Sequence, residues 1–147
     1  MLTQRGLRTL PVRLRQHDEN AHAVAEFLRD RVEAVYWPGL GTHPGYDVAQ
    51  RQQDSPGAML SFECPGGRAG VEALFNGSQM FSLAVSLGGV ESLWCHPATM
   101  THAGMTDEAR AIAGISPALV RLSIGIEDAG DLVADLDAGI ARAEAAS

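Results

Sequence analysis

The strand that decides the fold lies at residues 120–128, which read Val-Arg-Leu-Ser-Ile-Gly-Ile-Glu-Asp. Successive side chains of a strand point to opposite faces of a sheet, so the apolar residues at even positions would share one face. Arg121, Ser123 and Gly125 would share the other face, which is small and polar and lets another group approach closely. The pattern predicts a strand over residues 119–126 with its apolar face on the core.

A helix is expected directly after this strand. Asp128 is a suitable N-cap, and Asp131 three positions later resembles the second member of a capping box. The apolar residues that follow recur at helical spacing and would form one buried stripe. They are Leu132, Val133, Leu136, Ile140 and Ala143.

The rest of the chain alternates between helix and strand patterns. Apolar residues three and four apart predict a helix over the first thirty residues, in which Pro11 either produces a kink or begins a second helix. Further strands are expected at 32–37, 58–64 and 81–86, and further helices at 44–52, 68–75 and 106–113. This alternation is typical of a layered α/β domain.

Length and composition limit the classes of protein to consider. A chain of 147 residues with 46% hydrophobic residues fits one soluble domain. The net charge of -7 argues against a nucleic-acid partner, and no apolar run approaches the ~20 residues of a membrane span. Cys64 and Cys95 are too few for a disulfide framework, which favours reduced thiols in the cytoplasm. The sequence contains no lysine, so it offers no ε-amine for a Schiff base.

Arg121 is the first candidate for binding chemistry, because a planar guanidinium can hold a carboxylate at two points. The alternative is an ordinary exposed arginine on a strand. Ser86 is the second candidate, since a hydroxyl beside the exposed backbone of Gly88 and Gly89 can hold a carboxylate oxygen. A tight turn explains the same residues equally well. Together the two candidates predict a site for one end of an amino acid.

Metal binding and cysteine catalysis are not expected. None of the five histidines has the spacing with a glutamate that marks a zinc helix. Cys95 is adjacent to His96, and neighbours on an extended chain point apart, so the two would not form a catalytic pair. The glycine-rich motifs that bind nucleotide phosphates do not occur in the sequence.

Several blocks in a fixed order resemble one enzyme family. They occupy residues 5–10, 20–21, 36–40, 43–44, 57–63, 86–93, 96–102, 120–128 and 131–136. Together they resemble the C-terminal domain of the pyridoxal-phosphate-dependent enzymes of Cys/Met metabolism. Within that family, residues 98–105 are most similar to the cystathionine γ-synthases, which join an O-acyl-homoserine to cysteine by γ-replacement.

The resemblance implies a fold and a set of site residues. The fold would be a small, mostly antiparallel sheet with helices on one face, as in the C-terminal domain of fold-type I enzymes. Residues 1–30 would form the interdomain helix and residues 31–147 the small domain. By position, Arg121 would bind the substrate α-carboxylate, and Ser86, Leu87 and Thr101 would line the same pocket. The resemblance also implies a homo-oligomer, a tetramer in the full-length family.

Two departures from the family pattern matter. Val85 stands where the synthases and the cystathionine lyases usually carry glutamate, and a valine at this position is more similar to methionine γ-lyase. A γ-lyase that acts on methionine or cystathionine is the alternative. The family's cofactor domain, with the Schiff-base lysine, lies N-terminal to the matched region. We therefore expect the isolated chain to bind no pyridoxal phosphate covalently, to be inactive, and to expose an apolar patch that promotes self-association. A non-catalytic remnant that kept only this domain is the further alternative.

Overall fold

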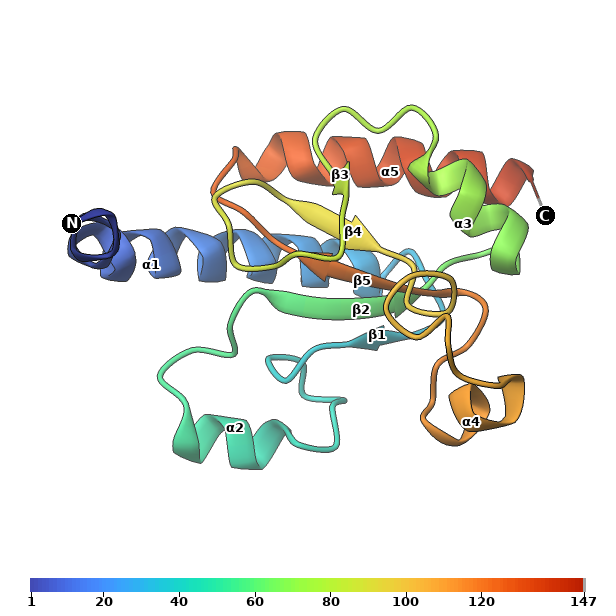
Figure 1. Ribbon diagram of the computed structural model, residues 1–147, viewed down its shortest axis with the longest axis horizontal. Coiled ribbons are helices and arrows are strands. Elements are labelled where there is room, and N and C mark those ends of the chain that lie inside the picture. Colours follow the sequence, from blue (N-terminus) through green and yellow to red (C-terminus); the bar gives the residue numbers. More distant parts are fainter. Residues whose placement is uncertain (147) are drawn as a thin grey trace.

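A mixed five-stranded sheet lies at the centre of the chain, which a computed structural model describes over residues 1–146 (Figure 1). The helices are α1 (Leu2–Arg29), α2 (Tyr46–Gln52), α3 (Gly67–Phe75), α4 (Asp107–Ile112) and α5 (Ala129–Ala145). The strands are β1 (Val35–Tyr36), β2 (Met59–Glu63), β3 (Ser82–Leu83), β4 (Leu93–Cys95) and β5 (Leu119–Ser123). The strand order is β1-β2-β5-β4-β3, so β5 lies in the middle of the sheet.

The sheet is mostly antiparallel, as the resemblance to the family implied. β1 with β2, β2 with β5, and β4 with β5 are antiparallel, whereas β3 with β4 is parallel. The register places Arg121 of β5 between Ser61 of β2 and Cys95 of β4. Because laterally paired residues point to the same face of a sheet, these three side chains belong to one surface.

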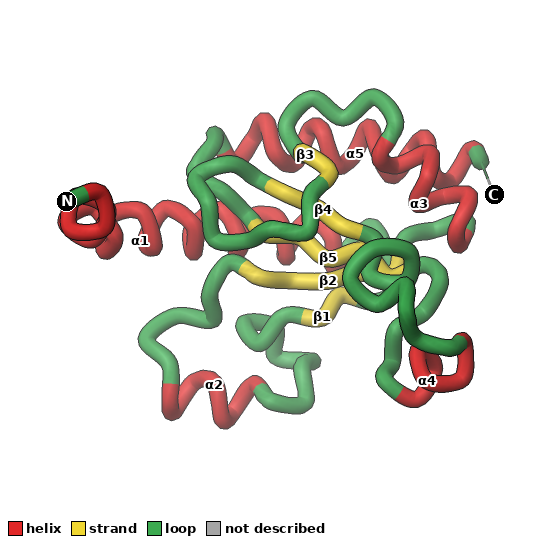
Figure 2. The backbone as a smooth tube through the Cα atoms, viewed as in Figure 1, coloured by secondary structure: helices red, strands yellow, loops and turns green. Residues whose placement is uncertain are grey.

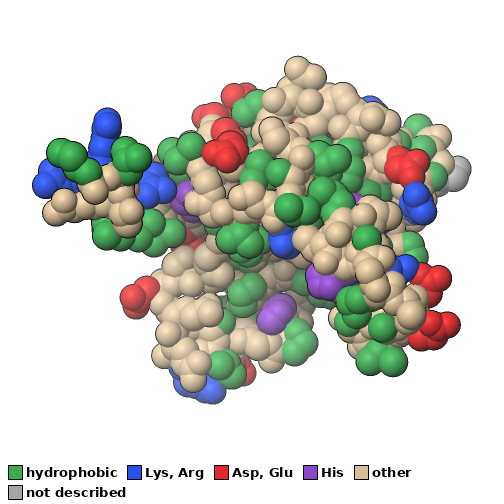
Figure 3. Space-filling view, in the orientation of Figure 1, with side chains coloured by type: hydrophobic (Ala, Val, Ile, Leu, Met, Phe, Trp, Pro, Cys, Tyr) green, Lys and Arg blue, Asp and Glu red, His purple; other side chains and the backbone are tan. Residues whose placement is uncertain are grey.

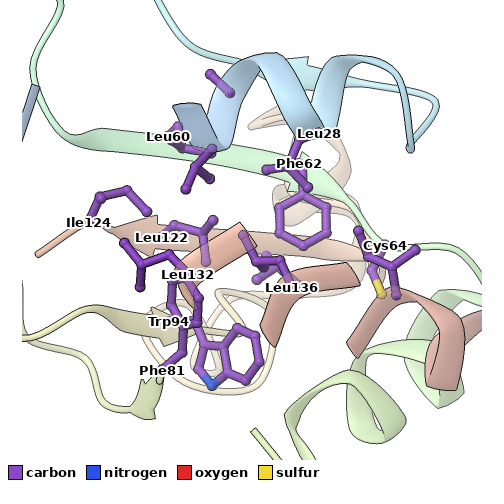
Figure 4. Close-up of a cluster of buried hydrophobic side chains, with 14 of the residues drawn as sticks. Leu28, Leu60, Phe62, Cys64, Phe81, Trp94, Leu122, Ile124, Leu132 and Leu136 are labelled. Carbon is purple, nitrogen blue, oxygen red and sulfur yellow. The ribbon is translucent and has the colours of Figure 1, made fainter. Parts of the chain in front are cut away.

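Three helices cover the opposite face of the sheet. α1 packs against α5 and β2, and α3 packs against α5 (Figure 2). Buried apolar side chains fill the space between the helices and the sheet (Figure 4). The labelled ones are Leu28, Leu60, Phe62, Cys64, Phe81, Trp94, Leu122, Ile124, Leu132 and Leu136. α2 and α4 lie apart from this layer, in connecting segments that are drawn below the sheet in Figure 1.

The expected strand boundaries differ from the structure in several places, and the strand expected over 119–126 ends at Ser123. β4 was not predicted, because Leu93, Trp94 and Cys95 are all buried and their sequence shows no polar alternation. The strands expected at 32–37 and 81–86 shrink to the pairs of residues in β1 and β3. Both are edge strands of the sheet, so each has only one neighbour to pair with.

The apolar patterns of α1, β5 and α5 predicted more buried residues than the structure shows. Leu7 and Leu14 are exposed, because the N-terminal part of α1 projects beyond the sheet and has nothing to pack against (Figure 1). Ile126 is 36% exposed, since the chain leaves the sheet before it reaches the N-cap of α5. Val133 is only partly buried at the edge of the core. Pro11 lies inside α1, which continues through it as a single helix.

Asp135 of α5 holds the loop that leads into β3. Its carboxylate accepts hydrogen bonds from the Ser78 hydroxyl at 2.6 Å and from the backbone N–H groups of Gln79 and Met80 at 3.0 and 2.9 Å. Burial raises the pKa of Asp135, but these hydrogen bonds outweigh it, so the pKa lies below its ordinary value. The ionised carboxylate therefore stabilises the folded chain.

We expect this contribution to disappear in acid. Because the pKa of Asp135 is lower in the folded chain than in the unfolded one, its stabilisation is complete above about pH 4 and is lost as the pH falls through the folded pKa. Asp135→Asn should lower the free energy of unfolding by about 2 kcal/mol at pH 7. The variant should also lose less stability than the parent chain as the pH falls from about 5 to about 3. Urea unfolding followed by circular dichroism at several pH values measures both effects.

Asp137→Asn is the matched control, since Asp137 lies on the same helix and pairs only with Arg31 at the surface. An unchanged acid sensitivity in Asp135→Asn would show that the Ser78–Met80 contacts do not stabilise the fold.

Candidate functional site

Arg121 lies at the centre of the face that no helix covers. Its Nη2 donates hydrogen bonds to the carbonyl oxygens of Val85 and Ser86, at 3.2 Å each. No carboxylate among residues 1–146 forms an ion pair with Arg121. The side chain is therefore oriented by neutral backbone groups and keeps its positive charge available.

The Nε–H group of Arg121 is buried and has no hydrogen-bond partner. A buried donor without an acceptor lowers the stability of a folded protein by about 1–3 kcal/mol, and such groups are therefore rare. Nη1 makes no hydrogen bond within residues 1–146 either. An anion that approached this guanidinium would find unused donors and an unpaired charge. A carboxylate oxygen could accept from Nε–H or from Nη1, and its negative charge would pair with the guanidinium.

The segment 85–92 runs along β5 and the residues that follow β5, and a series of hydrogen bonds joins the two. Arg121 binds the carbonyls of residues 85 and 86, the Ser123 hydroxyl accepts from Gly88 N–H at 2.9 Å, and Gly125 N–H donates to the Ser92 hydroxyl at 2.8 Å. Glu127 then accepts from both the N–H and the hydroxyl of Ser92, at 2.6 and 2.8 Å. The close approach predicted for this face is thus made by the chain itself.

Arg121 contacts Ser86 through the backbone carbonyl and not through the hydroxyl, so the expected role of the Ser86 hydroxyl in holding a carboxylate stays a prediction. Val85 and Leu87 flank that contact and are exposed, at 57% and 56%. Thr101 lies in the loop after β4, where its hydroxyl bonds to Nδ1 of His102. No hydrogen bond joins Thr101 to Arg121 in the described part of the chain. Its place in the site remains a prediction.

Sequence reasoning did not predict the contact between Ser92 and Glu127. Both are polar residues in stretches where neither a charge cluster nor a motif singles them out. The available signal was spacing, because Arg121, Ser123, Gly125 and Glu127 are all two residues apart and an extended chain places such residues on one face. The identity of the facing segment depends on the loop between β3 and β4.

A cavity lies beside this site rather than around Arg121. It measures about 640 Å³ and is lined mainly by apolar side chains of α1, the turn before β2, and residues 87 and 88. Ser123 lines it, but Arg121, Ser86 and Thr101 do not. Leu7 lies two turns before Leu14 on the same side of α1, and both are exposed. The projecting end of α1 carries hydrophobic and arginine side chains in Figure 3.

Cys95 is the cross-strand neighbour of Arg121. Burial raises the pKa of its thiol, and the positive charge of Arg121 opposes that rise. A protonated, buried thiol is a poor nucleophile and a poor metal ligand. Among residues 1–146 no three His, Cys, Asp or Glu side chains are grouped to hold a metal ion. None of the described helices is both long and apolar enough to span a membrane.

The sequence model of the Cys/Met metabolism PLP-dependent enzymes matches residues 1–141. The chain belongs to this family. It is 48% identical to L-methionine γ-lyase of Fusobacterium nucleatum over 94% of this chain and 35% of that protein. It is 50% identical to cystathionine γ-synthase of Escherichia coli over 97% of this chain and 37% of that protein. The chain thus spans little more than a third of the curated relatives it matches.

Solved structures agree with the family assignment. Cystathionine γ-synthase from Xanthomonas oryzae pv. oryzae, in complex with aminoacrylate and cysteine, superposes with a TM-score of 0.94 and 62% sequence identity. The match covers 99% of this chain and 38% of that chain. The expected fold, a layered sheet like that of fold-type I pyridoxal-phosphate enzymes, is therefore confirmed.

The family depends on pyridoxal phosphate, but the side chains of this chain do not fit the attachment of that cofactor. Attachment requires a lysine amine for the Schiff base, and the sequence has no lysine. The unpaired guanidinium of Arg121 instead fits the carboxylate of an amino acid. The sequence therefore offers no amine for a covalent link to the cofactor.

Proposed function

We propose that this chain forms the amino-acid-binding part of a pyridoxal-phosphate-dependent transsulfuration enzyme, in which Arg121 binds the substrate α-carboxylate. Ser86, Leu87 and Thr101 line the same pocket in this proposal. The chain works together with a lysine-bearing cofactor domain and is inactive alone. We expect a cytoplasmic homo-oligomer, with Cys64 and Cys95 reduced.

The buried, unpartnered Nε–H of Arg121 is the observation that carries this proposal. A substrate carboxylate would accept from it and would also neutralise a charge that no residue among 1–146 neutralises. The carbonyl oxygens of Val85 and Ser86 hold the guanidinium in place before the substrate arrives. Such preorganisation reduces the entropy that binding must overcome.

The proposed reaction is γ-replacement, in which an activated homoserine is joined to cysteine. The 62% identity to a cystathionine γ-synthase supports this reaction. The second candidate is γ-elimination from methionine, which the apolar side chain of Val85 favours. Val85 is exposed beside the Arg121 contact, where it would pack against a thioether methyl group.

Titration of the ¹⁵N-labelled chain with L-methionine tests the carboxylate site directly. We expect the Nε–Hε resonance of Arg121 to shift, with a Kd of roughly 1 mM. The analogue 3-(methylthio)propylamine, which lacks only the carboxylate, should leave that resonance in place. Arg121→Gln should weaken the binding of L-methionine at least about tenfold, because it removes the charge and most of the donors.

Arg68→Gln is the control, since Arg68 is exposed on α3 and pairs only with Glu72. Equal binding of the amine analogue, or unchanged binding by Arg121→Gln, would refute the carboxylate assignment. A parallel titration with L-cystathionine addresses the reaction. Tighter binding of L-cystathionine than of L-methionine would favour the synthase over the methionine lyase.

A further inference from the structure

The guanidinium of Arg121 is oriented by a segment that is itself anchored elsewhere. Nη2 donates to the carbonyls of Val85 and Ser86, which leaves Nε–H and Nη1 for a substrate carboxylate. The positions of these two carbonyls therefore decide where Arg121 places its remaining donors. These carbonyls belong to an exposed stretch that contains Gly88 in a left-handed conformation, with φ of 74°. Such a stretch needs fixed points to keep its shape.

Ser92 is the strongest fixed point of the segment. It is fully buried, and its N–H and hydroxyl both donate to the carboxylate of Glu127. The same hydroxyl accepts from the N–H of Gly125. Hydrogen bonds to an ionised acceptor are stronger than neutral ones, so this contact binds more firmly than the Ser123–Gly88 contact nearer to Arg121.

Glu127 is in turn held by α1. The side-chain amide of Asn20, which is fully buried, donates to the carbonyl oxygens of Gly125 and Glu127, at 3.1 and 2.7 Å. His17, one turn earlier, bonds to the carbonyl of Ile124 at 2.6 Å. The stretch that carries Glu127 is therefore fixed to a helix of the core.

We infer that Glu127, acting through Ser92, is a positioning residue that sets the orientation of the Arg121 guanidinium for the substrate carboxylate. This inference rests on the proposed function, since it assigns Glu127 to the same site. The charge of Glu127 acts on the segment 85–92, and the segment acts on Arg121 through its carbonyl oxygens. Glu127 itself does not touch the substrate.

The ¹⁵N-labelled chain without ligand provides the first test. Glu127→Ala should shift the Nε–Hε resonance of Arg121 and accelerate hydrogen exchange at Gly88 N–H, while the amides of β2 and β5 keep their protection. Glu127→Gln, which retains one acceptor for Ser92, should restore the resonance toward its original position. Glu91→Ala is the matched control, because Glu91 is the adjacent exposed carboxylate and has no partner among residues 1–146.

Binding of L-methionine provides the second test. We expect Glu127→Ala to weaken it about fivefold, because a long arginine side chain without its carbonyl partners loses its preorganisation. Glu127→Gln should lie within about twofold of the parent chain by the same argument. Glu91→Ala should bind as the parent does. If Glu127→Ala lowers the urea midpoint too far for these measurements, Ser92→Ala, which removes the hydroxyl that donates to Glu127, takes its place with the same expected results.

The outcomes separate this inference from the proposed function. If Glu127→Ala leaves the Arg121 resonance unchanged, or tightens binding, Glu127 is not a positioning residue, even if L-methionine binds the parent chain. If the resonance responds but the parent chain binds no carboxylate, Glu127 orients Arg121 and the proposed function fails.

Discussion

Replacing Trp94 with alanine is expected to lower the free energy of unfolding by about 4 kcal/mol. Trp94 is 1% exposed and lies on β4 between the sheet and the helices. Its ring stacks on Phe81 with centroids 5.0 Å apart, and Phe75 lies at the same centroid distance on a tilted plane. Alanine would remove the indole and leave a cavity next to two aromatic rings, which cannot close over it fully.

Urea unfolding followed by far-ultraviolet circular dichroism measures this change, because the signal does not depend on the removed tryptophan. Trp94→Phe keeps an aromatic ring and should cost about 1.5 kcal/mol. The phenylalanine variant also supplies a value if the alanine variant does not fold. If Trp94→Ala lowered the free energy of unfolding by less than about 1 kcal/mol, as a surface substitution does, β4 would not be part of the core.

Gly125→Ala is expected to cost about 3 kcal/mol through overpacking. A Cβ at Gly125 would lie 2.3 Å from the carbonyl oxygen of Val90 and 2.4 Å from an Oε atom of Glu127. The Val90 oxygen is a backbone atom that accepts from Ile126 N–H, so it cannot move without breaking that bond. The methyl group would therefore push the segment 85–92 away from β5.

Gly41→Ala is the control, because a Cβ at Gly41 meets nothing within 4 Å. Its free energy of unfolding should stay within about 0.5 kcal/mol of the parent chain. Hydrogen exchange at Ser92 N–H adds a local measurement, since that amide should lose protection in Gly125→Ala alone. Equal stability of the two alanine variants would show that the segment does not pack on Gly125.

The candidate site was partly predictable from the sequence. The alternation of residues 120–124 placed Arg121 and Ser123 on the face away from the core, and the structure confirms that arrangement. The resemblance to the family predicted that Ser86 and Arg121 share a site, and the structure places the Ser86 backbone carbonyl against the guanidinium. Neither argument reached Glu127, because its partner Ser92 is 35 residues away and the pairing depends on how the β3–β4 loop folds.

The periodicity of the chain determined most of its elements. Leu60 and Phe62 of β2 alternate with other residues, and Leu132 and Leu136 of α5 recur at helical spacing. Because burial of apolar surface stabilises the fold, each of these two elements has one favourable orientation. Asp128 likewise accepts from the N–H groups of Gly130 and Asp131 at the start of α5, a local contact that its position predicts.

Only the tertiary structure decided what each face meets. Gly125 looked suited to a ligand, yet the chain's own segment 85–92 occupies the space beside it. β4 could not be recognised locally, because a strand buried on both faces carries no alternation. The unpaired Nε–H of Arg121 likewise emerged only in three dimensions. Contacts between distant segments depend on the packing of the whole chain, and short-range spacing does not encode that packing.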